Sequence, residues 1–172
     1  PVTFTYTQPV PTYLHCHNCV PSLSSGNKGW QLQSQVGTLF HREADQAGVQ
    51  TAWSRRQCPN VSVGEKSPMG HVSPGEDAIR KGCVIHVDFG IERNDYCSDL
   101  QRVWYAAATE GEPAPEPVRR AYAAIVECIE MAAVALLPGI AGWEVDQRTR
   151  SHLTSLGYPE YPHALGHHLG RA

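Results

Sequence analysis

The chain has 172 residues, of which 41% are hydrophobic and 18% are charged. This composition predicts one globular domain with a hydrophobic core and excludes a wholly disordered protein. The net charge of −3 at pH 7 gives no basic surface, so nucleic acid is not an expected partner. No apolar run has the length of a membrane span, and the first residues lack the pattern of a signal peptide, so no membrane partner is expected.

Residues 1–30 differ from the rest of the chain. They are rich in Pro, Ser, Thr and Asn, and Lys28 is the only Lys, Arg, Asp or Glu among them, which predicts an irregular lead-in. Cys16 and Cys19 form a C-x-x-C pair here, but no second pair follows, so no metal or redox role is assigned to them. The six cysteines of the chain are spread over a core-forming sequence, and several lie inside apolar segments. They predict reduced thiols and a cytoplasmic location.

Residues 31–82 predict a helix followed by short strands and loops. Apolar residues recur at three- and four-residue steps over residues 31–48, and Gly48 ends the pattern. Short strands are expected at 49–53 and 58–63. A loop over 64–76 and a turn over 77–82 complete this part.

Two β-rich runs, 84–91 and 96–105, are separated by the turn-forming residues 92–95 and predict a hairpin. Each run carries one aspartate, Asp88 and Asp99. If residues 93–94 form the loop, the two aspartates lie directly opposite each other. If residues 94–95 form it, Asp88 faces Gln101 and Asp99 is its diagonal neighbour on the same face. A three-residue loop without a bulge would separate the acids.

After a Pro-rich linker at 110–117, two helices are predicted. The first carries an apolar stripe from Val118 to Leu136 that includes Ile125 and Ile129, and residues 138–139 end it. The second covers residues 143–156. Its inward-facing residues are expected to be Val145, Thr149, Leu153 and Leu156. Glu127 and Glu130 are expected on faces turned to water.

The chain closes with a histidine-rich segment that contains His163 and His167, with glycines at 166 and 170. Two carboxylates on one half-buried face repel each other unless they share a proton or a cation. Two aspartates and one imidazole would suit manganese, cobalt or zinc. The alternative is that one aspartate faces solvent and the other simply ends a strand.

The order of these motifs resembles the pita-bread-fold metallopeptidases, in particular the Xaa-Pro aminopeptidase (aminopeptidase P) and prolidase group. The motifs are HVDFG around Asp88, YCSDLQRVWY around Asp99 and HALGHHLGRA at the end, with SPMGHVSPGE upstream. The resemblance covers residues 31–172 and leaves 1–30 unmatched. It implies an α+β fold, a partial pita-bread domain in which helices cover a curved antiparallel sheet.

The resemblance also implies roles for individual residues. Asp88, Asp99 and His167 correspond to metal ligands of a site that holds two divalent metal ions. His163 corresponds to the histidine on the substrate side, and His71 to one that contacts the substrate or the developing oxyanion. His86 is expected to be a packed histidine rather than a ligand. The implied reaction is hydrolysis of a peptide substrate, at N-terminal Xaa-Pro bonds, by metal-activated water.

In this family two glutamates on later strands complete the metal site. The sequence stops at Ala172 and has no Glu after His167. We therefore expect a fragment of a longer enzyme, itself inactive, and the resemblance leaves a homodimer of the full-length protein open. Two alternatives are a non-catalytic peptide-binding module and a metal-free hydrolase like creatinase. Presence of both aspartates with His167 argues against them.

Overall fold

The structure is a computed structural model that describes residues 32–65, 71, 73–109, 112–169 and 171. The predicted lead-in, with Cys16 and Cys19, lies outside the described residues. The chain divides into two compact units, residues 1–113 with 169–172 and residues 114–168. Each unit is described by itself.

The first unit begins with helix α3, Gln33–Ala47, close to the predicted range. The side chain of Gln35 accepts a hydrogen bond from the backbone N–H of Leu32 at 2.9 Å, which satisfies a donor at the first turn. Gly48 ends the helix in the left-handed conformation, at φ 65°, where a glycine is favoured. The helix boundaries are therefore set by the local signals that the sequence contains.

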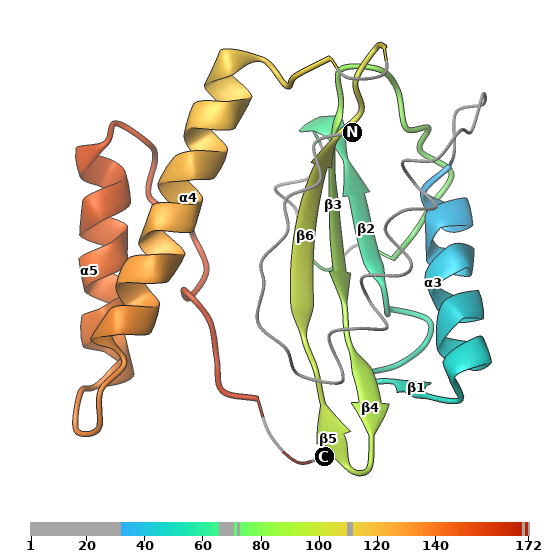
Figure 1. The fold of residues 1–172 in the computed structure, drawn as a ribbon, viewed down its shortest axis with the longest axis horizontal. Helices are drawn as coiled ribbons and strands as arrows, with labels where there is room; N and C mark the ends of the chain where they lie inside the picture. The colour runs from blue at the N-terminus through green and yellow to red at the C-terminus, as the bar shows by residue number, and fades with distance from the viewer. Residues whose placement is uncertain (1–31, 66–70, 72, 110–111, 170, 172) are drawn as a thin grey trace. The chain divides into compact units, whose positions relative to one another are not determined.

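The strands of the first unit form two three-stranded antiparallel sheets, ordered β1-β4-β5 and β2-β3-β6. Figure 1 shows α3 beside the second of these sheets. The strands are β1 Gln50–Thr51, β2 Asn60–Val63, β3 Val84–Phe89, β4 Ile91–Arg93, β5 Tyr96–Cys97 and β6 Leu100–Tyr105. Strands and helices were both predicted, and the α+β expectation is confirmed.

The central hairpin uses the register with a two-residue loop at Asn94 and Asp95. Both residues have positive φ, 55° and 65°, the conformation of a type I′ turn, which Asn and Asp tolerate. Asp88 accordingly pairs with Gln101 across the β3–β6 ladder. Of the two predicted registers that bring the acids together, the structure adopts the one in which Asp99 is the diagonal neighbour of Asp88.

Gly90 joins β3 to β4, where the ribbon passes from one sheet to the other. A Cβ atom at this position would collide with the backbone carbonyl of Ser98 and would lie 2.5 Å from the Trp53 ring. The Gly90 carbonyl also accepts hydrogen bonds from the Ala52 N–H at 3.0 Å and from the Cys58 thiol at 3.4 Å. This close approach of three segments explains why the residue two after Asp88 is a glycine.

The hydrophobic core of this unit lies between α3 and one face of the β2-β3-β6 sheet. Alternating residues of the strands point into it, and Phe40 of α3 meets Phe89 of β3 edge to face with ring centroids 4.9 Å apart. Its buried apolar members include Val36, Val61, Val63, Ile85 and Val87. Because one face is occupied by this core, the other residues of the strands project from the opposite face.

The second unit pairs helix α4, Glu116–Ala135, with helix α5, Gly142–Ser155. Both helices lie where the sequence predicts them. The small residues Ala124, Cys128 and Ala132 are buried on α4. The predicted apolar stripe is wrong in part, because Ile125 and Ile129 are 44% and 50% exposed.

On α5, three of the four predicted inward residues are buried, namely Val145, Thr149 and Leu153. Leu156 is 46% exposed, so that expectation is wrong: it is the C-cap and follows the last helical residue. Glu127 and Glu130 are exposed as predicted. Among the described helices, none combines the length and apolar character needed to cross a membrane.

Candidate metal centre

The β2-β3-β6 sheet has a polar face opposite its core face. Asn60 and Ser62 alternate with core valines on β2, and His86 and Asp88 alternate with core residues on β3. The ladder places Asn60 opposite Asp88 and Ser62 opposite His86. Gln101 of β6 lies across from Asp88 on the other side. Asp88 is therefore flanked by a polar residue on each neighbouring strand.

Asp88 and Asp99 interact within this face. Asp88 is buried and Asp99 is half-buried. The pKa of Asp88 is raised to about 6, mainly by burial and then by a hydrogen bond with Asp99 and the charge of Asp99, while the charge of His86 and a hydrogen bond from Asn60 oppose the shift. The causes correspond to desolvation and like-charge repulsion. The hairpin thus brings the two carboxyl groups together, as its predicted register requires.

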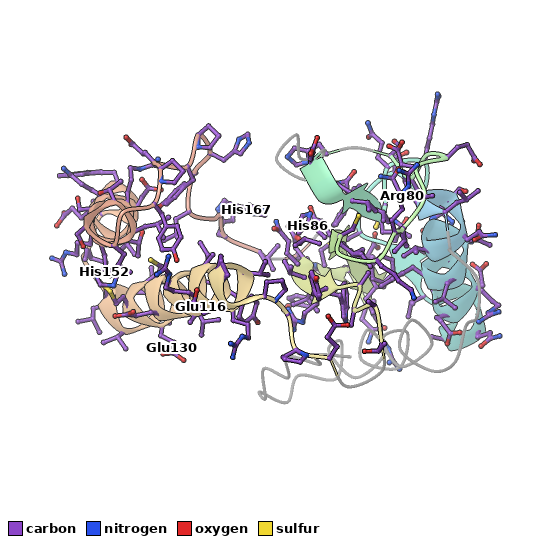
Figure 2. All side chains as sticks on the ribbon, turned by 90° about the horizontal axis from the view of Figure 1, so that it is seen from above. Arg80, His86, Glu116, Glu130, His152 and His167 are labelled. Carbon is purple, nitrogen blue, oxygen red and sulfur yellow. The ribbon has the colours of Figure 1, made fainter. Side chains whose placement is uncertain are left out.

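His86 is held by its neighbours on both sides, and Figure 2 labels it on the sheet. Its Nδ1 lies 3.4 Å from Ser62 Oγ, and its Nε2 lies 3.0 Å from Gln101 Oε1. Both ring nitrogens are occupied by side chains of adjacent strands, which orients the ring. His86 therefore occupies the packed position expected of it.

Two buried oxygens on this face have no hydrogen-bond partner among the described residues, Asp88 Oδ1 and Asn60 Oδ1. A buried acceptor without a donor is costly, and native structures seldom retain one unless an ion or another group satisfies it. Carboxylate and amide oxygens are also the donors that hard divalent cations prefer. The polar face around Asp88 therefore fits a divalent cation by both criteria.

The two C-terminal histidines belong to the second unit. His163 and His167 are exposed, and the ring of His167 has its Nδ1 3.0 Å from the carbonyl oxygen of His168. The Arg150 guanidinium donates to the carbonyl oxygen of His163 at 3.0 Å. Arg150 itself is paired with Asp146 at 2.7 Å, so this pair fixes the backbone that carries His163.

Asp146 connects α5 to the same segment a second time. Its Oδ1 accepts the backbone N–H of Leu165 at 2.7 Å, and the Arg150 side chain lies over the Tyr161 ring at 4.1 Å from the centroid. Hydrogen bonds from Arg150, and to a smaller extent from Leu165 and Tyr161, lower the pKa of Asp146. The segment with the histidines is thus tied to the helix by charge-assisted hydrogen bonds.

His71 lies in the loop after β2, as predicted, where it is exposed and has a positive φ of 45°. Its neighbours 66–70 and 72 lie outside the described residues. No three His, Cys, Asp or Glu side chains gather into a possible metal site within the part of the chain that the structure describes. The joint ligation of a metal by Asp88, Asp99 and His167 therefore stays a prediction, as do the roles of His71 and His163.

Sequence reasoning missed Asn60 and Ser62 as members of this face, whereas one of the two predicted registers already placed Gln101 opposite Asp88. The run from Asn60 to Val63 alternates polar and valine residues, a period-two signal that predicts a polar strand face. The sequence therefore contained the signal for a polar strand face. It did not reveal which residue lies opposite Asn60 or Ser62, because that depends on how β2 and β3 align.

A family model supports the interpretation of these motifs. The model for metallopeptidase family M24 matches residues 16–172, most of the chain. The chain belongs to metallopeptidase family M24. The hairpin with both acids on one face is therefore part of a chain whose family is named for metallopeptidases.

The individual proteins that the chain resembles are also named as peptidases. The chain is 30% identical over 111 residues to the uncharacterized peptidase YqhT of Bacillus subtilis, an alignment that covers 64% of this chain and 30% of that protein. The structure resembles the X-Pro aminopeptidase of Thermotoga maritima, with a TM-score of 0.77 and 23% identity. It also resembles a dipeptidase of Pyrococcus horikoshii, with a TM-score of 0.77 and 25% identity.

These likenesses confirm the partial pita-bread fold. Each covers 92% of this chain, but only 43% of the Thermotoga protein and 42% of the Pyrococcus protein. The chain therefore spans less than half the length of the relatives it matches.

Proposed function

We propose that this chain supplies half of a two-metal site in a peptidase that cleaves N-terminal Xaa-Pro bonds. The observation that carries the proposal is the pair Asp88 and Asp99, whose carboxyl groups interact on a half-buried face and raise the pKa of Asp88. Two like charges in this position are favourable when cations lie between them. Family membership supports hydrolysis as the reaction.

Each proposed residue has a stated task. Asp88 and Asp99 hold divalent cations, and His167 adds an imidazole nitrogen to the same site. His163 and His71 donate hydrogen bonds to the substrate carbonyl as negative charge develops on its oxygen. Manganese, cobalt or zinc, when bound, would supply an activated water for attack on the peptide carbonyl. A cytoplasmic location and a peptide as the partner complete the proposal.

The preference for proline is the most specific part of the proposal. It is supported by the fold shared with an X-Pro aminopeptidase and by the order of His71, Asp88, Asp99, His163 and His167 in the chain. We also propose that the 172-residue chain alone turns over little substrate, because two aspartates and one imidazole leave two metals without the acids that the family adds after the histidine.

The test begins with the coding sequence downstream of Ala172, which is expected to encode two glutamates borne on strands. That longer product and the 172-residue chain are then assayed with manganese on Xaa-Pro dipeptides and Xaa-Pro-Yaa tripeptides, with Xaa-Ala peptides as the control. We expect manganese-dependent cleavage before proline by the longer product alone. Equal cleavage of Xaa-Ala peptides would overturn the specificity, and strong turnover by the 172-residue chain would overturn the need for further ligands.

A further inference from the structure

Asn60 and Asp88 form a buried cross-strand pair. They are directly opposite each other in the β2–β3 ladder, so their side chains project from the same face of the sheet as close neighbours. Asn60 is 5% exposed and Asp88 is 8% exposed. The Oδ1 atom of each is buried and has no hydrogen-bond partner among the described residues. Two acceptor oxygens thus lie on neighbouring strands, and the part of the chain that the structure describes offers neither of them a donor.

The orientation of the Asn60 amide follows from its hydrogen bond with the Asp88 carboxyl. An ionised carboxylate only accepts hydrogen bonds, so the N–H side of the amide faces it. The Oδ1 atom is then left as an acceptor. Asn60 therefore carries a buried acceptor oxygen on a side chain that is hydrogen-bonded to the Asp88 carboxyl.

A cation suits these two oxygens better than a further hydrogen-bond donor would. Asp88 and Asp99 repel each other, and among the described residues the positive charge that acts on the Asp88 carboxyl is that of His86. His86 is already engaged by Ser62 and Gln101. A hard divalent cation would relieve the repulsion and satisfy both orphaned oxygens at once, because such cations bind carboxylate and amide oxygens together.

We propose that Asn60 is an oxygen ligand of the divalent cation held by Asp88, so that β2 contributes to the metal centre through Asn60 Oδ1. The inference rests on the proposed function and adds a residue that the sequence motifs do not assign. An added amide oxygen shifts the donor set toward hard cations such as Mn²⁺ and away from softer ones.

The test measures Mn²⁺ binding to the metal-free 172-residue chain by calorimetry and by the loss of the free Mn²⁺ electron paramagnetic resonance signal. Two substitutions at one position separate ligation from packing. Asn60→Leu keeps the approximate volume and removes the oxygen, and it should weaken binding about tenfold or more. Asn60→Asp replaces one oxygen ligand with a stronger one and should bind Mn²⁺ at least as tightly as the unmodified chain.

Ser62→Ala is the matched control, because Ser62 is buried on the same strand and face but lies opposite His86. It should leave Mn²⁺ affinity unchanged. Circular dichroism and cooperative thermal unfolding check that each variant folds. Unchanged affinity in Asn60→Leu would overturn the proposal, and so would equal weakening in Asn60→Leu and Asn60→Asp, which indicates a packing role. If Asp88→Asn still abolishes binding in those cases, the proposed function stands without Asn60. If the unmodified chain binds no Mn²⁺, both proposals fail.

Discussion

The Asp88 carboxyl shows how a residue that suits metal binding lowers the free energy of unfolding of the metal-free protein. Its pKa rises from 3.8 to about 6, first because it is buried and then because of its hydrogen bond with Asp99 and the charge of Asp99. The folded state therefore holds a proton that the unfolded chain loses above about pH 4. As pH rises from about 4 to about 6, the free energy of unfolding of the metal-free protein should fall, and it should stay at the lower value above that window.

Asp88→Asn should remove this pH dependence and raise the free energy of unfolding above pH 6, by on the order of 1–2 kcal/mol. Urea unfolding of the metal-free chain between pH 4 and pH 8 measures both effects. Asp95→Asn is the control, since Asp95 lies exposed in the turn of the same hairpin, and it should keep the original profile. A pH profile unchanged in Asp88→Asn would assign the slope to another group.

How much of the centre could be predicted also differs from residue to residue. Asp88 and Asp99 belong to one hairpin, so strand alternation and a short turn suffice to bring them together. Asn60 joins them only through the pairing of β2 with β3, strands separated by a long loop. Such a register depends on the packing of the whole sheet against α3 rather than on a local signal, and the sequence does not express it.

At the scale of elements, Gly90 is the point where the two sheets meet. Gly90→Ala places a methyl group against the Ser98 carbonyl, the Trp53 ring at 2.5 Å and the Ala52 side chain at 2.9 Å. Backbone and ring atoms cannot yield cheaply there, so the substitution should lower the free energy of unfolding by about 1–3 kcal/mol or more. Because the shift acts on the residue two after Asp88, Mn²⁺ affinity should fall as well.

Gly142→Ala is the matched control for that substitution. Gly142 is the first residue of α5, and a Cβ there would meet nothing within 4 Å, so alanine should be neutral or slightly stabilising. Thermal unfolding of both variants, followed by circular dichroism, makes the comparison. Equal melting temperatures for the two variants would contradict the steric role of Gly90.

The helices show what periodicity reveals and what it omits. Gly48 ends α3, Pro115 and Pro117 mark the start of α4, and Gly157 follows the end of α5. These signals act within one turn of the helix. The buried face of α4 does not follow from its largest apolar residues. The helix buries small side chains such as Ala124 and Cys128, while Ile125 is 44% exposed. A hydrophobic stripe identifies an amphipathic helix, but the neighbouring element decides which residues it covers.

At the scale of the whole molecule, the proposed ligands are divided between the two units. Asp88 and Asp99 belong to the first unit and His167 to the second. If one cation binds all three, the units are coupled energetically through the metal, and substitutions in different units cannot act independently. Separate binding to the acids and to the histidine would give additive effects instead.

A double-mutant cycle with Asp99→Asn and His167→Ala decides between these cases. With Mn²⁺ affinity of the 172-residue chain as the readout, each single substitution should weaken binding, and the double variant should bind little worse than the weaker single variant. His168→Ala is the control for the histidine, because it is adjacent in sequence and is not a proposed ligand. Additive losses within about 0.5 kcal/mol, or an effect of His168→Ala equal to that of His167→Ala, would remove His167 from the proposed centre and leave a cation bound by the first unit alone.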